Sequence, residues 1–121
     1  MADRTAKRER GRLGEHVTER LLRRAGLVIL ARNWRGAGGE LDLVAMEGET
    51  VVFVEVKSRA GAFHPDHPAV ARAQRRRIGR AARAFRSRYG VRHLPYRFDL
   101  VTLEGPLDTP RVNWQKRQSE V

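Results

Sequence analysis

The stretch GELDLVAMEGETVVFVEVKSR, residues 39–59, restricts the fold more than any other part of this 121-residue chain. Hydrophobic and polar side chains alternate on both sides of EGE, and Gly48 stands where a type II′ turn prefers glycine. A two-residue turn at Gly48 and Glu49 pairs Leu43 with Val54. The sequence therefore predicts an antiparallel hairpin with one wholly apolar, buried face, formed by Leu41, Leu43, Ala45, Val52, Val54 and Val56.

The other face of this hairpin carries charged side chains. The same register places Asp42 opposite Glu55, and Glu40 opposite Lys57. Opposed side chains lie about 4.5 to 5.5 Å apart at Cβ, so the two carboxylates repel each other. A divalent cation bound by both would relieve the repulsion, and hard oxygen ligands suit Mg²⁺ or Mn²⁺. The alternative is a solvated strand face with cross-strand ion pairs, and the apolar neighbours on this face argue against it.

Lys57 is one of three lysines in a chain that has 22 arginines. The other two, Lys7 and Lys116, lie near the ends of the chain. A compact ammonium group can lie beside a reacting water or phosphate oxygen, where a forked and permanently charged guanidinium cannot substitute. The rarity of lysine therefore makes Lys57 a candidate catalytic residue.

Two segments have the apolar spacing of helices. The first starts at about Gly11 and ends at Gly26, and the polar residues before it are expected to fray; its apolar positions are Leu13, Val17, Leu21, Leu22 and Ala25. The second covers residues 69–89 and is closed by Gly90. Its predicted inward face consists of Val70, Gln74, Ile78, Ala81, Ala82, Phe85 and Tyr89.

Further strands are predicted before and after these elements. LVILARNW is a strand followed by a glycine turn, and LPYRFDLVTLE alternates as a strand does. PRVNWQKRQSEV is either a short strand or a loose tail. The order α-β-β-β-α-β predicts one α/β domain, a mixed sheet flanked by two helices, with a core over about residues 11–103 and flexible polar ends at 1–10 and 104–121.

The formal net charge of +11 points to a polyanionic partner such as DNA or RNA. Arginines gather in the second predicted helix, where no Asp or Glu lies between Ala69 and Tyr89, which favours phosphate contact over a merely solvated face. The absence of cysteine excludes disulfides, thiolate metal sites and cysteine nucleophiles. The start of the chain lacks the apolar core of a signal peptide, and no run is long enough to span a bilayer, so we expect a cytoplasmic protein without membrane contact.

Several motifs of the chain resemble those of known protein families. GELDLV followed by VVFVEVKSR resembles the signature of PD-(D/E)XK nucleases. GRLGEHVTERLLRRAGLVILARNWR before the signature and YRFDLV after it match the YraN family, small bacterial proteins that are distantly similar to archaeal Holliday junction resolvases. The resemblance covers residues 11 to about 103. It implies a restriction-endonuclease-like fold and a metal-dependent phosphodiesterase.

The resemblance also implies roles for individual residues. Asp42 and Glu55 would bind the metal with the backbone carbonyl of Val56, and Lys57 would orient or activate the attacking water. Glu15 would bind the metal through water or complete a second site, unless it is an ordinary exposed helix glutamate. The residues expected to contact nucleic acid are Gln74, Arg72, Arg75, Arg76 and Arg80, with Glu40 in a supporting role.

Three features of the sequence have two interpretations each. Gln74 could instead be a buried glutamine satisfied by backbone groups. Asp99 either supports a metal ligand or pairs with Arg97. The HPDHP motif, residues 64–68, lacks any established zinc spacing, and we expect it to contact substrate rather than to bind zinc.

Together these patterns predict an endonuclease, dependent on Mg²⁺ or Mn²⁺, that acts on DNA, branched or junction DNA included. The resemblance further suggests a homodimer whose two sites cut opposing strands. The alternative is a basic nucleic-acid-binding or adaptor protein that has a nuclease fold without catalytic turnover.

Overall fold

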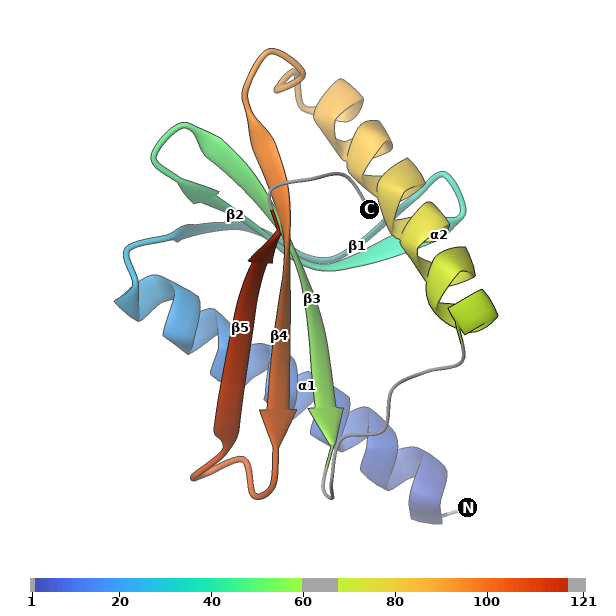
Figure 1. Ribbon diagram of the computed structural model, residues 1–121, viewed down its shortest axis with the longest axis vertical. Coiled ribbons are helices and arrows are strands. Elements are labelled where there is room, and N and C mark those ends of the chain that lie inside the picture. The colour runs from blue at the N-terminus through green and yellow to red at the C-terminus, as the bar shows by residue number, and fades with distance from the viewer. Residues whose placement is uncertain (1, 60–67, 118–121) are drawn as a thin grey trace.

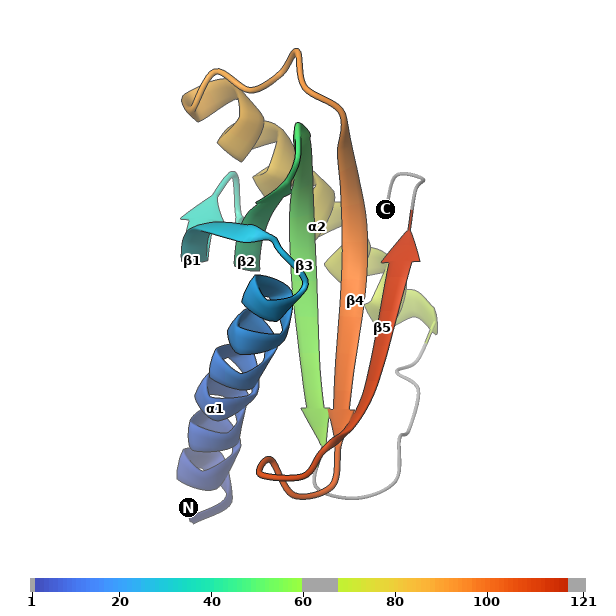
Figure 2. The same cartoon turned by 90° about the vertical axis from the view of Figure 1, so that its left-hand side faces the viewer.

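The computed structural model describes residues 2–59 and 68–117 as one small α/β domain. A five-stranded mixed sheet has the strand order β1-β2-β3-β4-β5, and one helix lies on each of its faces (Figures 1 and 2). The elements are α1 (Ala2–Arg24), β1 (Val28–Gly36), β2 (Gly39–Glu47), β3 (Thr50–Arg59), α2 (Pro68–Arg88), β4 (Tyr96–Glu104) and β5 (Arg111–Arg117). The predicted mixed sheet with two flanking helices is confirmed.

Helix α1 begins at Ala2, well before the predicted start at Gly11, so the prediction of a fraying segment is wrong for the described residues. Tertiary contacts stabilise this early part. One guanidinium nitrogen of Arg10 donates to the carbonyl of Arg59 at 2.7 Å and to that of Gly105 at 2.6 Å. These bonds tie α1 to the ends of β3 and β4, which no local sequence pattern reveals.

The predicted hairpin register is confirmed from Leu43–Val54 to the turn, where Gly48 has φ of 59°. The backbone pairing recorded for β2 and β3 ends at Leu43–Val54, and the strands then diverge (Figure 1). The predicted opposition of Asp42 to Glu55 is therefore wrong as a strand pair. The side chain of Asp42 instead takes a backbone partner, because its Oδ2 accepts the Val56 N–H at 2.9 Å.

The same divergence corrects two other predicted pairs. Glu40 lies opposite Arg35 of β1 rather than Lys57, and its carboxylate is 3.5 Å from the Arg35 Nε. Leu41 is buried against the α2 side of the sheet, not on the face of Leu43. Residues 39–42 of β2, on the N-terminal side of Leu43, are therefore not paired with β3. Their side chains do not take the faces that a continued antiparallel pairing would give them.

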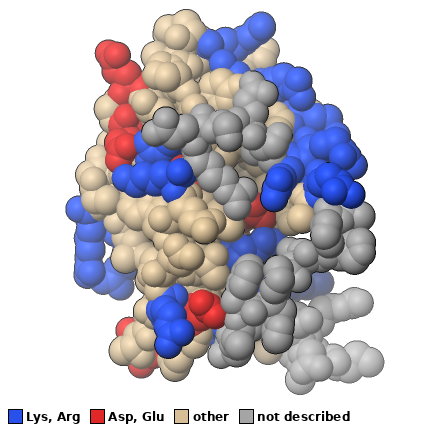
Figure 3. Space-filling view, in the orientation of Figure 1, with Lys and Arg blue, Asp and Glu red and all other residues tan. Residues whose placement is uncertain are grey.

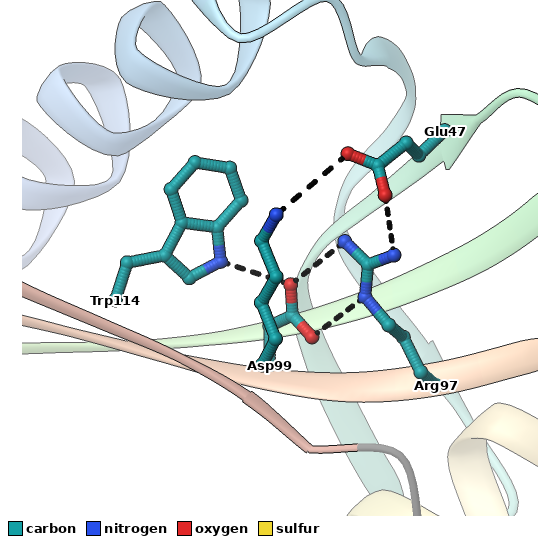
Figure 4. A network of polar contacts seen from close by, with 5 residues as sticks. Glu47, Arg97, Asp99 and Trp114 are labelled. Carbon is teal, nitrogen blue, oxygen red and sulfur yellow. Dashed lines mark hydrogen bonds and ion pairs between the residues drawn. The ribbon is translucent and has the colours of Figure 1, made fainter.

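The C-terminal segment forms a strand, so the alternative of a loose tail is wrong for residues 111–117. Strand β5 pairs antiparallel with β4, and a buried polar network joins them (Figure 4). Asp99, 2% exposed, accepts two hydrogen bonds from the guanidinium of Arg97 and one from the Trp114 indole at 2.9 Å. Arg97 also donates to Glu47 on β2 at 2.6 Å. Of the two readings of Asp99, the pairing with Arg97 is the one observed.

Two hydrophobic clusters make up the core, one on each face of the sheet. The α1 side contains Leu22, Leu27, Leu43, Ala45, Val52, Val54, Val101 and Leu103. The α2 side contains Leu41, Val44, Val51, Phe53, Ala81, Ala82, Phe85 and Phe98. Both faces of β2 and β3 are therefore covered, as expected for strands in the middle of a two-sided α/β sheet.

Helix α2 confirms the second predicted helix and approaches the sheet very closely at one point. A Cβ atom on Gly39 would overlap the backbone carbonyl of Arg77. Glycine at this position lets the helix backbone lie directly against the start of β2. Neither helix of the described residues carries an apolar stretch of the length that a membrane crossing needs.

Candidate active site

The divergence of β2 and β3 opens a cavity between the sheet and α2. Its volume is about 200 Å³, and acidic side chains of the sheet meet polar and basic side chains of the helix there. The charged and polar lining residues include Glu40, Asp42, Glu55, Gln74, Arg75 and Arg77. The strand pair that carries the predicted metal ligands and the helix that carries the predicted phosphate contacts thus face one hollow.

Asp42 is half-buried at this hollow, and its pKa is raised to about 7. Burial of the carboxyl is the main cause, since it penalises the charged form. The carboxylates of Glu15, Glu55 and Glu40 raise the pKa further, while the Val56 N–H opposes the shift. Asp42 and these three glutamates therefore make a group of four acidic side chains that interact electrostatically, and a cation among them would favour the ionised form of Asp42.

Lys57 connects β3 with α2. Its Nζ lies 3.2 Å from Glu55 Oε1 and donates a hydrogen bond to Gln74 Oε1, also at 3.2 Å. Glu55 Oε1 is buried and, among the described residues, accepts no hydrogen bond of good geometry despite this ion pair. Gln74 itself lines the cavity and accepts this hydrogen bond from Lys57, which favours a role at the site over a glutamine satisfied by backbone groups.

Glu15 lies on α1, the helix on the opposite face of the sheet from α2. Its carboxylate is close enough to Asp42 to raise the pKa of that carboxyl. Glu15 is half-buried rather than exposed, and its pKa is raised chiefly by burial. Asn33 on β1 donates to Glu15 Oε1 at 2.9 Å and lies 3.5 Å from Glu40 Oε1. This amide links two of the four carboxylates.

Sequence reasoning missed Asn33. Its φ of 47° lies in the left-handed region, which asparagine tolerates better than most residues. A strand that contains an asparagine between a basic and an aromatic residue is the one signal that could have indicated it. The contact with Glu15 depends on the approach of α1 to β1, which the sequence does not specify locally.

The described residues contain no group of three or more acidic or histidine side chains placed to hold a metal ion. Glu15 therefore does not join Asp42 and Glu55 in one ready-made ligand set. The smaller set predicted from the sequence has two carboxylates and one carbonyl, so this finding leaves it open. Residues 64–67 of the HPDHP motif, and with them the zinc alternative, lie outside the described residues.

The predicted phosphate-contacting arginines lie on α2. Arg72, Arg75, Arg76 and Arg80 are all exposed on this helix. The space-filling view shows basic side chains gathered on the side of the molecule where α2 runs (Figures 1 and 3). Arg75 also lines the cavity that holds Asp42 and Glu55, so the basic surface begins at the acidic site.

Comparison with known proteins places this sequence in a family. Residues 14–103 match the sequence model described as uncharacterised protein family UPF0102. A UPF0102 protein of Herminiimonas arsenicoxydans is 38% identical over 118 residues, which is 97% of this chain and 91% of the relative. One from Pseudomonas aeruginosa is 39% identical over 120 residues, 94% of each chain. One from Symbiobacterium thermophilum is 42% identical over 98 residues, covering 79% of this chain and 83% of the relative.

Proposed function

The chain belongs to the uncharacterised protein family UPF0102, the YraN family, and we propose that it is a metal-dependent endonuclease that hydrolyses phosphodiester bonds in DNA. One observation carries this proposal. Asp42, Glu55 and Lys57 meet where β2 and β3 diverge, and Gln74 of α2 contacts the lysine directly. The same divergence, in a mixed sheet with a helix on each face, supports assignment to the PD-(D/E)XK fold.

The donor set fits a hard divalent cation such as Mg²⁺ or Mn²⁺. Glu55 offers a buried oxygen without a hydrogen bond, and Asp42 is surrounded by like charges that a cation would offset. The N–H and C=O of a strand residue point to the same side, so the Val56 carbonyl lies on the side of β3 where its N–H donates to Asp42. When bound, the metal would supply Lewis-acid polarisation of the phosphoryl oxygen.

The remaining residues act on the water and the substrate. The Lys57 ammonium is held between Glu55 and Gln74, where it can orient a water molecule toward the phosphorus atom. Asn33 holds Glu15 beside the other carboxylates through its side-chain amide. The arginines of α2 bind the phosphates of the DNA backbone, which gives affinity without base readout.

The test is cleavage and metal binding by purified variants. We expect Asp42→Asn and Glu55→Gln to abolish Mn²⁺-dependent cleavage of DNA while leaving DNA binding largely intact, because each removes a metal ligand and neither changes α2. Calorimetric titration with Mn²⁺ should show binding to the wild type and its loss in Asp42→Ala. Full cleavage by either variant would refute the assignment. Binding of DNA without any cleavage by the wild type would favour the adaptor alternative.

A second measurement addresses the DNA contact. Affinity for duplex DNA should fall steeply with salt concentration, because phosphate contacts release counterions. Replacing Arg75, Arg76 and Arg80 together by Glu should weaken binding to all sequences alike. Affinity that does not change with salt would show that these arginines contact something else.

A further inference from the structure

A second groove runs along α2 beside the start of β4. Its volume is about 450 Å³, and its described lining contains five arginines and no acidic residue. The arginines and the tyrosine that line it are Arg75, Arg76, Arg80, Arg83, Arg86 and Tyr96. Arg75 and Phe98 line both this groove and the cavity of the carboxylates, so the two hollows are contiguous.

The far end of this groove holds a stacked pair. The guanidinium carbon of Arg86 lies 3.9 Å from the ring centroid of Tyr96. Arg86 also donates to the carbonyl of Arg92 at 3.0 Å, which fixes the guanidinium in place. The Tyr96 ring packs edge-on against Phe53 and Phe98, so the platform is rigid. Unpaired nucleobases stack on arginine planes and aromatic rings of this kind.

Gly79 lies in the middle of the arginine row. A Cβ atom added there would meet nothing within 4 Å, so the glycine leaves open space along the helix. Glycine inside a helix costs about 1 kcal/mol relative to alanine. No neighbouring atom would contact a Cβ at this position, and the absence of a larger side chain keeps the middle of the arginine row open.

The groove has the length of several nucleotides. Arg75 and Arg86 are separated along α2 by about 16 Å at about 1.5 Å per residue. At the duplex rise of about 3.4 Å per nucleotide this distance would correspond to about five stacked nucleotides, and an unstacked, extended strand covers it with fewer. A paired duplex keeps the faces of its bases stacked inside and presents phosphates and base edges, whereas an unpaired strand also presents base faces that can stack on a protein.

We propose that this groove binds single-stranded nucleic acid, with phosphates on the arginines of α2 and one base stacked on Arg86 over Tyr96. The strand would continue past Arg75 to the carboxylates. The binding site stands on the groove itself, and its connection with hydrolysis rests on the proposed function.

The experiment measures fluorescence anisotropy of labelled oligo(dT), oligo(rU) and a blunt duplex of equal length, in EDTA. Arg86→Lys keeps the charge and removes the stacking plane, and Arg83→Lys is the matched control in the same groove. We expect Arg86→Lys to weaken binding of the single strand about tenfold and to leave duplex binding and the salt dependence unchanged. Arg83→Lys should change single-strand binding less than threefold. The affected oligonucleotide identifies DNA, RNA or both as the ligand.

A second pair of variants tests the space in the groove. Gly79→Ala fills little of it and Gly79→Leu fills much of it, and both raise helix propensity, so folding should survive. We expect Gly79→Leu to weaken single-strand binding well beyond Gly79→Ala. Equal effects of Arg86→Lys and Arg83→Lys, or an equal loss on duplex, would overturn the proposal.

The outcome is separate from that of the nuclease proposal, because binding is measured without metal. If Asp42→Asn abolishes cleavage while Arg86→Lys leaves single-strand binding unchanged, the groove proposal alone fails. If Arg86→Lys weakens binding as expected while the wild type cleaves nothing with Mn²⁺, the nuclease proposal alone fails.

Discussion

Lys57 contacts two side chains from different layers of the fold, Glu55 on its own strand and Gln74 on α2. If it were a counter-charge alone, Lys57→Arg would be nearly harmless, because arginine pairs with carboxylates at least as well. If it positions water, the larger planar group displaces the nucleophile, and a misplacement of about 1 Å costs on the order of a hundredfold in rate.

We therefore predict that Lys57→Arg keeps its affinity for Mn²⁺ and DNA but loses about a hundredfold in single-turnover cleavage at saturating Mn²⁺. Lys7→Arg and Lys116→Arg are the matched controls and should change nothing. A Lys57→Arg rate within a few-fold of the wild type would assign the lysine a purely electrostatic role.

The raised pKa of Asp42 predicts how stability changes with pH in the absence of metal. The folded-state pKa of about 7 exceeds the ordinary value of 3.8, so the folded protein favours the protonated carboxyl. The stability that this preference contributes is present at low pH and is lost as the pH rises through about 7. Asp42→Asn removes the titration, and its side-chain carbonyl can still accept the Val56 N–H.

We expect the free energy of unfolding in urea to decline less for Asp42→Asn than for the wild type between about pH 5 and about pH 8. At the upper end the variant should be the more stable protein. Glu49→Gln, a substitution in the exposed hairpin turn, is the control and should keep the wild-type dependence. If Asp42→Asn is less stable than the wild type at every pH and its free energy of unfolding depends on pH as the wild type's does, the raised pKa of Asp42 is contradicted.

At the scale of the elements, the closest approach of α2 to β2 depends on a glycine, Gly39. Gly39→Ala would force the Arg77 carbonyl away from β2. We expect a loss of about 1 to 3 kcal/mol in the free energy of unfolding, the usual cost of overpacking. Gly79→Ala on the same helix meets open space and should stabilise by up to about 1 kcal/mol. Chemical denaturation of both variants checks the opposite signs, and a neutral Gly39→Ala would refute the close approach.

The elements differ in how far the sequence predicts them. The register of β2 and β3 follows from alternation and turn chemistry, so it was predictable up to Leu43 and Val54. Beyond that point the Asp42 side chain bonds to a backbone amide, a tertiary arrangement that alternation cannot indicate. The early start of α1 was missed for a similar reason, since its charged residues lack apolar spacing and Arg10 bonds to carbonyls distant in sequence.

The candidate site shows the same division. Asp42, Glu55 and Lys57 could be identified from the sequence because charged side chains are unusual in an otherwise apolar hairpin. Asn33 and the stack of Arg86 on Tyr96 were not identified, because each depends on the meeting of two elements that are separated in the chain. Charge patterns within one element are visible in a sequence, whereas contacts between elements require the fold.

At the scale of the whole molecule, the described residues of one domain carry one cavity lined by the candidate carboxylates, so the proposed nuclease would cut one strand at a time. Cutting both opposing strands of a branched junction requires two copies, and a twofold pair would supply them. We predict that light scattering at micromolar concentration detects a dimer, either alone or with a four-way junction. A monomer in both states would remove paired incision from the proposal.

The parallel pairing of β3 with β4 also bears on the order in which the chain folds. The hairpins that bring Asp42, Glu55 and Lys57 together close over short turns, while Val51 meets Tyr96 only after α2 has crossed the sheet. Contacts between residues distant in sequence form late, because loop closure costs entropy before they can stabilise the chain. We therefore expect the acidic half of the site to assemble first and the arginine helix to dock afterward. Until α2 docks, a partly folded chain carries the carboxylates without the arginine surface that we propose binds nucleic acid.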